Sequence, residues 1–316
     1  MTDTVAAVVV TYNRKNLLIE CLDALLKQTR PVQKIILIDN ASTDGTPEFL
    51  RERGYLNNSF IEYTRLPENT GGAGGFHEGV KRGQELGYDW LWLMDDDAEP
   101  ELNALEILSH YFNQNDTAAL ANLKVGIDGV PQYGHRGWFN FCAWSSQVVK
   151  PIDDKALLEE TVEIDHASFV GILIKKISVD AIGLPKEDFF IHYDDVEYCS
   201  RIRSCGKIIL IPASRIIHKD GAGRRLVTRI SFGRTSDRFP IDKMWISYFG
   251  YRNMIWLKKS KCSIYPLLIF FIALRQAVGI MIYDDHKINR LRFYLGATLD
   301  GVKGRFNNKS PLKYMK

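Results

Sequence analysis

Residues 90–97 read Trp90-Leu91-Trp92-Leu93-Met94-Asp95-Asp96-Asp97 and join a continuous apolar run to three adjacent carboxylates. An uninterrupted apolar run of this length is typical of a fully buried strand. Adjacent carboxylates repel one another unless a cation neutralises them, and the first and third side chains of an extended chain point the same way. We therefore predict that Asp95 and Asp97 bind one hard divalent cation where the strand ends. The alternative is a solvated turn before a helix.

Apolar runs and helical periodicity alternate on the N-terminal side of this stretch. Strands are predicted over 5–11, 34–39, 59–65 and 90–94, with helices over 15–28, from about 47, and over 74–86. Further on, strands are predicted over 118–125 and 207–211 and a short helix over 195–205. This alternation predicts βαβ units and a mostly parallel sheet, an α/β fold. Polar groups follow each of the first four strands, and ligands of such sheets bind at that edge.

The amino-acid composition is that of an ordinary globular protein. A length of 316 residues predicts one large domain with an appendage. The five cysteines are scattered without CxxC spacing, which indicates thiols in a reducing compartment and no zinc site. The apolar run 5–10 lacks a preceding basic region, so we expect a first strand and no signal peptide.

Charge is distributed unevenly along the chain. Residues 245–316 contain 13 Lys or Arg and 3 Asp, whereas residues 1–244 contain 28 basic and 35 acidic residues. This asymmetry predicts a basic, helical C-terminal segment with an anionic partner, either a membrane surface or nucleic acid. The apolar runs 263–274 and 277–283 are separated by Arg275 and Gln276, so we expect helices lying in the membrane interface and not a span. A helical cap packed on the sheet is the alternative.

Two more polar groups lie at predicted strand ends. Asp39 directly follows a strand, where a carboxylate can accept hydrogen bonds from a base or a ribose; a helix cap is the alternative. Residues 71–75 contain four glycines, which let backbone N–H groups approach a phosphate at the positive end of a helix. The pattern is neither GxxxxGK[ST] nor a GxGxxG directly after the first strand, which argues against P-loop and dinucleotide sites.

A second acidic cluster, Asp194-Asp195-Val196-Glu197, is predicted to begin a short helix. There Asp195 could act as general base for a hydroxyl nucleophile, with Asp194 or Glu197 orienting it or holding the acceptor. N-capping by Asp194 and an ion pair with Arg201 are the alternative. His218 ends a β-branched strand, and an imidazole with two carboxylates is a ligand set for Mn²⁺ or Mg²⁺; a structural histidine is the alternative.

Six motifs in this order resemble the GT-A glycosyltransferases of family 2: Val10-Thr11-Tyr12-Asn13-Arg14, Ile38-Asp39-Asn40-Ala41-Ser42-Thr43-Asp44, Asn69-Thr70-Gly71-Gly72-Ala73-Gly74-Gly75-Phe76, Asp95-Asp96-Asp97-Ala98, Asp194-Asp195-Val196-Glu197-Tyr198 and Ile216-Ile217-His218. The resemblance covers about residues 4–222. It implies a Rossmann-like, mostly parallel sheet flanked by helices, a nucleotide-sugar donor and inversion of the anomeric centre. We accordingly divide the chain into a catalytic domain over 1–230 and a helical, membrane-associating segment over 231–316.

The resemblance also implies roles for individual residues. The donor site would comprise Thr11, Tyr12, Arg14, Asp39, Asn69, Gly71, Gly72, Gly74, Asp95 and Asp96. Asp95, Asp97 and His218 would hold Mn²⁺ or Mg²⁺ on the diphosphate, and Asp195, aided by Asp194, would deprotonate the acceptor. For the acceptor site we select Trp138, His135, Phe169 and Glu197, with core packing as the alternative for Phe169.

Within the family, the glycine-rich loop most resembles bacterial galactofuranosyltransferases that use UDP-galactofuranose. Rhamnosyltransferases using dTDP-rhamnose are the alternative. The expected acceptor is a lipid-linked glycan in cell-surface polysaccharide synthesis, at the cytoplasmic, inner face of the cell membrane. Anionic lipid would attract basic residues such as Lys258, Lys259 and Lys261, and the tail aromatics would insert at headgroup level. Homo-oligomer formation is left open.

Two rival functions explain fewer of these features. A nucleic-acid-binding protein would use the basic tail, but it leaves Asp95–Asp97 and the glycine-rich loop without a role, so no nucleic acid is expected. A nucleotidyltransferase would carry a basic glycine-rich signature near the first strand, and residues 10–14 lack one.

Overall fold

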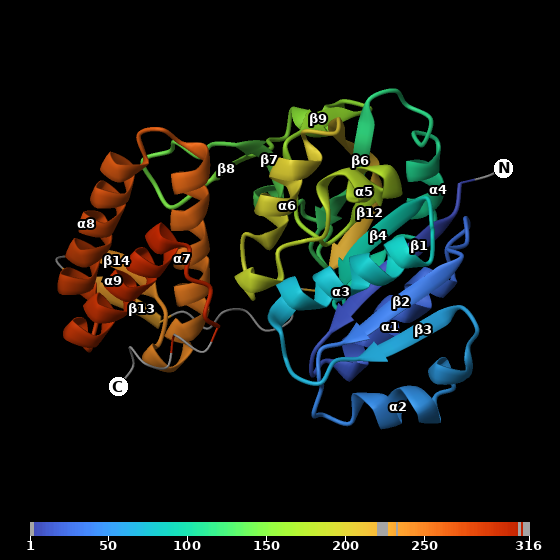
Figure 1. Cartoon of the computed structure of the whole chain (residues 1–316), viewed down its shortest axis with the longest axis horizontal. Helices are drawn as coiled ribbons and strands as arrows, with labels where there is room; N and C mark the ends of the chain where they lie inside the picture. Colours follow the sequence, from blue (N-terminus) through green and yellow to red (C-terminus); the bar gives the residue numbers. More distant parts are fainter. Residues whose placement is uncertain (1–2, 220–226, 232, 309–310, 312–316) are drawn as a thin grey trace. The chain divides into compact units, whose positions relative to one another are not determined.

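The computed structural model describes residues 3–219, 227–231, 233–308 and 311. The chain forms two compact units, each of which draws on separate stretches of sequence (Figure 1). The first unit comprises Met1–Trp138, Pro151–Glu187 and Asp194–Gly221, and the second comprises Phe139–Lys150, Asp188–Tyr193 and Ala222–Lys316.

A nine-stranded mixed sheet forms the centre of the first unit, in the order β3-β2-β1-β4-β11-β6-β12-β5, with β9 paired to β12. The strands are β1 Val5–Thr11, β2 Lys34–Asp39, β3 Ile61–Arg65, β4 Trp90–Asp95, β5 Ala98–Pro100, β6 Thr117–Val125, β9 Val162–Ile164, β11 Ile172–Lys175 and β12 Lys207–His218. Strands β3, β2, β1 and β4 are parallel, as are β6 and β12. The six predicted strands are present, but β11 is antiparallel to both β4 and β6, which the sequence did not predict.

Helices cover both faces of this sheet. The side chains of β1 alternate between the two faces, so each face presents apolar side chains to a different helix. Val8 and Val10 face α3 (Gly71–Glu85) at Gly79 and Gly75, where a Cβ atom would come within 2.4 Å of the valines. Val5, Ala7 and Val9 pack on the other face with Leu18 and Leu22 of α1 (Lys15–Leu26). The remaining helices of the unit are α2 Thr46–Glu52, α4 Ala104–Ser109, α5 Lys176–Ile182 and α6 Asp194–Ile202.

Shorter strands lie beside the main sheet. Strand β10 (His166–Ala167) is antiparallel to β7 (Arg136–Phe139), with His166 opposite Gly137. Strand β8 is Val149–Pro151. The buried guanidinium of Arg136 donates hydrogen bonds to the backbone carbonyls of Asn122 and Val170. This buried arginine therefore ties β7 to the edge of the main sheet.

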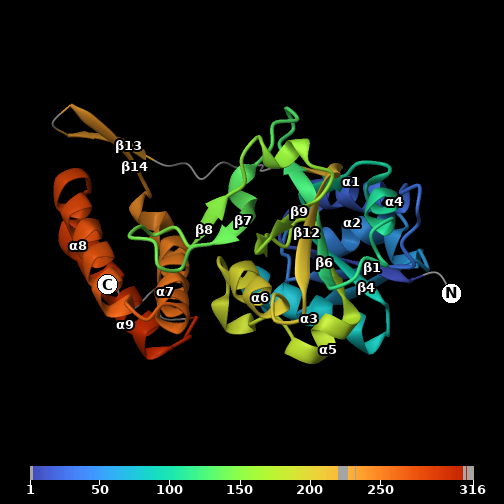
Figure 2. The ribbon, with the colours of Figure 1, turned by 90° about the horizontal axis from the view of Figure 1, so that it is seen from above.

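Three helices and a hairpin make up most of the second unit: α7 Met244–Lys261, α8 Tyr265–Tyr283, α9 Lys287–Lys303, β13 Val227–Ser231 and β14 Arg234–Arg238 (Figure 2). Tyr248 and Phe249 of α7 pack against Phe293 and Ala297 of α9 in a small core. Gly301 allows close packing there, since a Cβ atom would lie 2.6 Å from the Arg252 carbonyl oxygen. The predicted C-terminal helices are thus present, and α7 and α9 pack on each other in a small core that the sequence did not predict.

The stretch 139–150 is bound to the helices of the second unit. Cys142 and Cys262 form a disulfide with their Cα atoms 5.6 Å apart, so the prediction that all the cysteines are thiols is wrong. The ammonium of Lys258 donates hydrogen bonds to the carbonyls of Phe141 (3.0 Å) and Ala143 (2.9 Å). Burial lowers the pKa of Lys258 to about 8. Because Lys258 is fully buried, the prediction that it faces lipid is wrong.

The stretch 188–193 has an unusual backbone that α7 stabilises. Phe190, His192 and Tyr193 all have φ between 64° and 68°, a left-handed conformation that is costly for residues with a side chain. The buried amide of Asn253 donates to the carbonyls of Phe189, Ile191 and His192, and Arg252 donates to those of Asp188 and Phe189. Helix α7 therefore supplies the donors that satisfy this strained turn, directly before α6 begins.

Candidate active site

Asp96 joins the carboxyl ends of β1 and β4. Its carboxylate accepts hydrogen bonds from the Thr11 hydroxyl (2.7 Å) and the Tyr12 backbone N–H (3.3 Å). Arg14 lies 3.4 Å from Asp96 and donates to Asp97 at 2.6 Å. The parallel pairing of β1 and β4, with Val10 opposite Asp95, brings these predicted donor-site residues together. The Arg14 guanidinium is half exposed and so can also reach a ligand.

His218 is brought to the carboxylates by a strand pair that the sequence did not predict. Strand β5 directly follows the three acids and pairs antiparallel with the end of β12, so that His218 lies opposite Ala98. As a result, His218 Nε2 lies 3.2 Å from Asp97 Oδ1. Asp97 and His218, which are 121 positions apart in the sequence, are thus brought together by the pairing of β5 with β12.

The three carboxylates differ in their electrostatic surroundings. Burial, together with repulsion from Asp97 and Asp96, raises the pKa of Asp95 to about 7. Burial likewise raises the pKa of Asp96 to about 6, against the opposing effect of Arg14. Burial alone would raise the pKa of Asp97 too, but His218, Arg14 and Lys124 lower it below its usual value. Desolvation is therefore the largest influence on all three carboxylates, and a nearby positive charge favours their charged forms.

Asp97 and His218 fit two of the predicted ligands of a divalent cation. Within the described residues, Asp97 Oδ1 and His218 Nδ1 are buried, and apart from the 3.2 Å approach of His218 Nε2 to Asp97 Oδ1 neither atom has a hydrogen-bond partner. A carboxylate oxygen and an imidazole suit Mn²⁺, and a cation would stabilise the charged forms of these desolvated carboxylates. No group of three or more His, Cys, Asp or Glu side chains arranged to hold a metal occurs in that part of the chain, and the predicted set of Asp95, Asp97 and His218 stays a prediction.

Asn40 connects the end of β2 to the glycine-rich loop. Its amide donates to the Gly71 carbonyl (2.8 Å), and its Oδ1 accepts from the Thr70 backbone N–H (2.9 Å). The Asn69 side chain accepts from Gly71 N–H at 2.8 Å. A Cβ atom on Gly74 would lie 2.3 Å from the Thr70 hydroxyl, so glycine is required for this tight start of α3. The predicted helix begins three residues earlier than expected, at Gly71.

Asp39 is buried and already has partners on both carboxylate oxygens. Ser42 N–H donates to Oδ1 at 2.8 Å, and the Tyr63 hydroxyl donates to Oδ2 at 2.7 Å. Burial and the Asp39 carboxylate raise the pKa of Tyr63. The contact with Ser42 closes a turn before α2, whose N-cap is Gly45, so Asp39 does not cap that helix. The predicted contact of Asp39 with a base or ribose stays a prediction.

The second acidic cluster begins α6, as predicted. Asp195 Oδ1 accepts from Val196 N–H at 2.7 Å, and Oδ2 lies 3.4 Å from His166 Nε2. Burial raises the pKa of Asp194 well above its usual value, and the neighbouring Asp195 adds to this shift. Burial alone would raise the pKa of Asp195, but His166 lowers it, so Asp195 is the ionised partner of the pair. A partly exposed, ionised carboxylate is suited to accept a proton.

The four acceptor-site candidates differ in their surroundings. Glu197 is bound by both of its oxygens to Arg201, at 2.9 and 2.8 Å. The Phe169 ring is buried between Phe76 and Tyr198, with centroids 4.7 and 6.0 Å away, so core packing accounts for it. The His135 ring lies 6.2 Å from that of His218, and burial, with Lys124 and Arg136 nearby, lowers the pKa of His135 to about 3. His135 therefore remains neutral beside the cluster.

Trp138 donates its indole N–H to the Glu163 carbonyl at 3.0 Å. Contacts of all four candidates with an acceptor stay predictions.

The sequence analysis missed Lys124, a buried cation of β6 that lowers the pKa of Asp97, and His166 beside Asp195. Lys124 is the only charged residue in the mostly apolar stretch 117–125, and this was the available signal for it.

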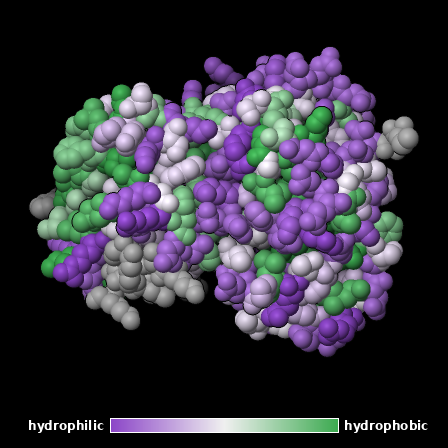
Figure 3. Space-filling model, in the orientation of Figure 1, coloured by the Kyte–Doolittle hydropathy of each residue, from purple (hydrophilic) through white to green (hydrophobic). Residues whose placement is uncertain are grey.

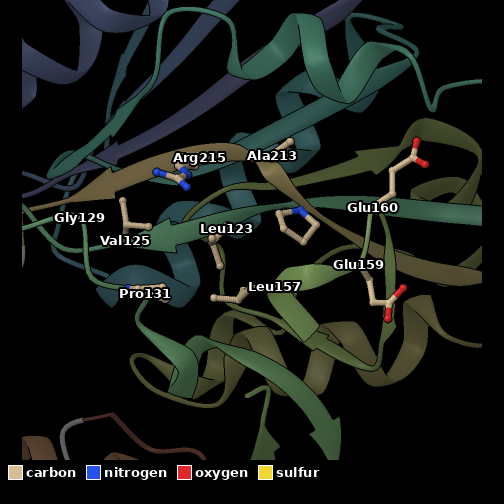
Figure 4. Close-up of a pocket in the computed structure, with 10 residues that line it drawn as sticks. Leu123, Val125, Gly129, Pro131, Leu157, Glu159, Glu160, Ala213 and Arg215 are labelled. Carbon is tan, nitrogen blue, oxygen red and sulfur yellow. The ribbon is translucent and has the colours of Figure 1, made fainter. Parts of the chain in front are cut away.

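A cavity of about 280 Å³ lies elsewhere in the first unit (Figure 4). Leu123, Val125 and Leu157 form its apolar wall, and Arg215 and Glu159 lie at its border. None of the predicted site residues lines it. The candidate active site is therefore the edge of the sheet and not this cavity.

The sequence profile described as "Glycosyl transferase family 2" matches residues 6–179. This match covers more than half of the chain, including β1, the glycine-rich loop and the three carboxylates. The chain belongs to glycosyl transferase family 2. It is 30% identical over 258 residues to galactofuranosyltransferase GlfT1 of Mycolicibacterium smegmatis, covering 80% of this chain and 82% of the relative.

GlfT1 of Mycobacterium tuberculosis is 29% identical over the same length, with 80% and 81% coverage. The dTDP-rhamnosyl transferase RfbF of Shigella flexneri is 22% identical over 317 residues, covering 96% of this chain and 97% of the relative. These similarities establish a glycosyltransferase and leave the sugar to be tested.

Solved structures show the same fold. GalNAc-T7, crystallised with UDP, GalNAc and Mn²⁺, superimposes with a TM-score of 0.63 at 17% identity, over 96% of this chain and 58% of that one. Residues 1–349 of S. aureus TarS with UDP-GlcNAc superimpose with a TM-score of 0.57 at 14% identity, over 95% and 81%. The family 2 chain thus has the predicted GT-A fold, with a mixed sheet and C-terminal helices.

Proposed function

We propose that this family 2 glycosyltransferase transfers galactofuranose from UDP-galactofuranose to a lipid-linked glycan in the synthesis of a cell-surface polysaccharide. The observation that carries the proposal is the match to two galactofuranosyltransferases over 80% of the chain, at 30% and 29% identity. The glycine-rich loop at the start of α3 supports it. The similarity to RfbF, which spans 96% of the chain, makes dTDP-rhamnose the second candidate donor.

The residues of the site divide the proposed reaction between them. Asp195 takes the proton of the acceptor hydroxyl as its oxygen bonds to the anomeric carbon, and the bond from that carbon to the diphosphate breaks with inversion. Arg14 offers positive charge to the departing diphosphate, and the backbone N–H groups at the start of α3 can bind phosphate. Asp97 and His218 would hold Mn²⁺ or Mg²⁺, which supplies Lewis-acid neutralisation of the leaving group when bound.

A donor screen tests the proposed sugar. Purified protein with Mn²⁺ and a lipid-linked glycan acceptor is expected to release UDP from UDP-galactofuranose at least tenfold faster than nucleotide from UDP-galactose, UDP-glucose or dTDP-rhamnose. The five-membered ring of a furanose differs in shape from the six-membered ring of a pyranose, and a fitted donor site can discriminate between the two. Faster release from dTDP-rhamnose would replace the proposed donor with the second candidate.

We also propose that helix α8 places the enzyme on the inner, cytoplasmic face of an anionic membrane. Leu267, Phe270, Leu274, Val278 and Met281 are each between 48% and 61% exposed on one side of α8. Leu268, Ile269, Ile272 and Ile280 on the other side are buried. Figure 3 shows the apolar surface over α8. Exposed apolar patches of this kind often mark membrane or protein contacts.

The position of Arg275 favours a helix that lies in the plane of the membrane. By length and composition, α8 is the one helix of the described residues that could cross a membrane, which alone is a weak indication. Arg275 lies near its middle and is exposed, and an arginine at the centre of a span costs about 2.5–3.5 kcal/mol. In an interfacial helix the same side chain reaches the headgroups. Lys259 and Lys261 are exposed at the end of α7 and add positive charge.

Replacing Phe270 and Leu274 by Ser tests the membrane proposal. We expect binding to vesicles of anionic lipid to fall at least about tenfold, because each side chain that leaves the apolar layer loses roughly 1.5–3 kcal/mol. Phe271 is left unchanged since its ring contacts Trp144 at 5.5 Å. Cosedimentation measures the effect, and the matched control is Leu102→Ser with Ile177→Ser, two exposed apolar residues of the first unit. Equal binding by both double variants would reject α8 as the contact.

A further inference from the structure

His166 is a buried imidazole that makes no ordinary hydrogen bond to the residues that the structure describes. It lies on the two-residue strand β10, is 4% exposed, and neither Nδ1 nor Nε2 has a hydrogen-bond partner among residues that the structure describes. Leaving a buried polar group unsatisfied is costly, so such groups usually have a functional partner or bind a ligand. The pairing of His166 with Gly137 fixes the backbone of this residue.

Asp195 is the nearest acceptor for this imidazole. His166 Nε2 lies 3.4 Å from Asp195 Oδ2, slightly beyond an ordinary N–H···O hydrogen bond. The other carboxylate oxygen accepts from Val196 N–H at 2.7 Å. In molecules without substrate, catalytic hydrogen bonds are often long and shorten when the substrate binds. A contact between His166 Nε2 and Asp195 Oδ2 can therefore fix the orientation of the carboxylate.

The other charged and titratable groups around Asp195 do not supply this contact. Asp194 and Glu197 on α6 are acids, and Cys199, also on α6, donates its thiol to the Ala167 carbonyl. On the side of β7, the guanidinium of Arg136 is directed to backbone carbonyls and the Ser168 hydroxyl. His135 is held neutral by burial and by nearby cations, which lower its pKa. Only His166 combines a donor with proximity to Oδ2 among the groups named here.

We propose that His166 is the positioning residue of Asp195, donating from Nε2 to Oδ2 so that the carboxylate is held ready for the acceptor hydroxyl. The inference rests on the proposed role of Asp195 as general base. When the acceptor O–H bond breaks, the proton moves to Asp195 and the acceptor oxygen bonds to the anomeric carbon. His166 touches none of the reacting atoms and acts through the carboxylate.

His166→Ala and His166→Gln test the proposal in the full-length protein. His166→Ala is expected to lower kcat about tenfold to a hundredfold, the usual effect of losing a hydrogen bond to a charged group, and to leave the KM for donor unchanged. His166 lowers the pKa of Asp195, so its removal raises that pKa and moves the acid limb of the rate profile to higher pH. His166→Gln retains a donor and is expected to recover part of kcat. His110→Gln, an exposed histidine outside the site, is the control.

A double-variant cycle separates this inference from the proposed base. If His166 acts through Asp195, adding His166→Ala to Asp195→Asn lowers kcat no further. Equal losses in both backgrounds, or an acid limb that does not move in folded His166→Gln, would overturn the positioning role while Asp195 remains the base. Full activity of Asp195→Asn alone would instead overturn the base, and the positioning role with it.

Discussion

Asp195→Asn is expected to lower turnover by roughly 10²–10⁴-fold while donor binding stays near wild type. Asparagine keeps the shape of the side chain and can accept from Val196 N–H, but it cannot take a proton. The carboxylate is partly exposed, and His166 lowers its pKa, so the substitution removes the group on α6 that we propose as the base. Release of UDP measures turnover, and calorimetry with UDP measures donor-site binding.

Asp180→Asn provides the control for this substitution. Asp180 is an exposed carboxylate of α5 whose ion pair with Lys176, at 2.7 Å, lies outside the site. Its replacement is expected to leave turnover within twofold of wild type. If Asp195→Asn instead weakens UDP binding and spares turnover, Asp195 belongs to the donor site and another residue is the base.

Asp97→Ala is expected to abolish transfer and to weaken Mn²⁺ binding at least tenfold, with the fold intact. The side chain contributes a buried oxygen 3.2 Å from His218 Nε2, and its loss leaves a single imidazole for the cation. The fold should survive because removing one of three adjacent carboxylates also relieves repulsion on Asp95 and Asp96. Electron paramagnetic resonance of free Mn²⁺ reports binding independently of activity.

Glu52→Ala, which removes an exposed carboxylate at the end of α2, is the matched control and is expected to bind Mn²⁺ as wild type does. Wild-type transfer rates in Asp97→Ala, or in wild type with excess EDTA, would exclude the proposed metal dependence.

Local patterns in the sequence identified the first half of the sheet and one edge of the site. The apolar run of β4 and the carboxylates after it were recognisable because strand burial and residue chemistry are properties of neighbouring residues. The antiparallel strand β11 was missed because its four residues carry no mark of direction or partner. The pairing of β5 with β12, which brings His218 to Asp97, likewise depends on contacts between distant residues.

His166 and Asn40 were missed for a related reason. A lone histidine on a two-residue strand has no motif around it, and its proximity to Asp195 arises only from tertiary packing. Asn40 lies inside a quoted motif, but its role depends on where Gly71 lies in space. The disulfide joins cysteines 120 residues apart, a pairing that spacing cannot reveal.

The second unit is built from three stretches of chain, whereas the sequence analysis placed a single boundary at residue 230. We therefore expect that residues 231–316 cannot be replaced on their own by the corresponding segment of another family member. A chimera that received a foreign 231–316 alone would present α7 with a mismatched turn at 188–193 and leave Cys142 without its partner. Among related proteins, substitutions in α7 should accordingly occur together with changes in 139–150 and 188–193. A functional chimera should require all three stretches from the same protein.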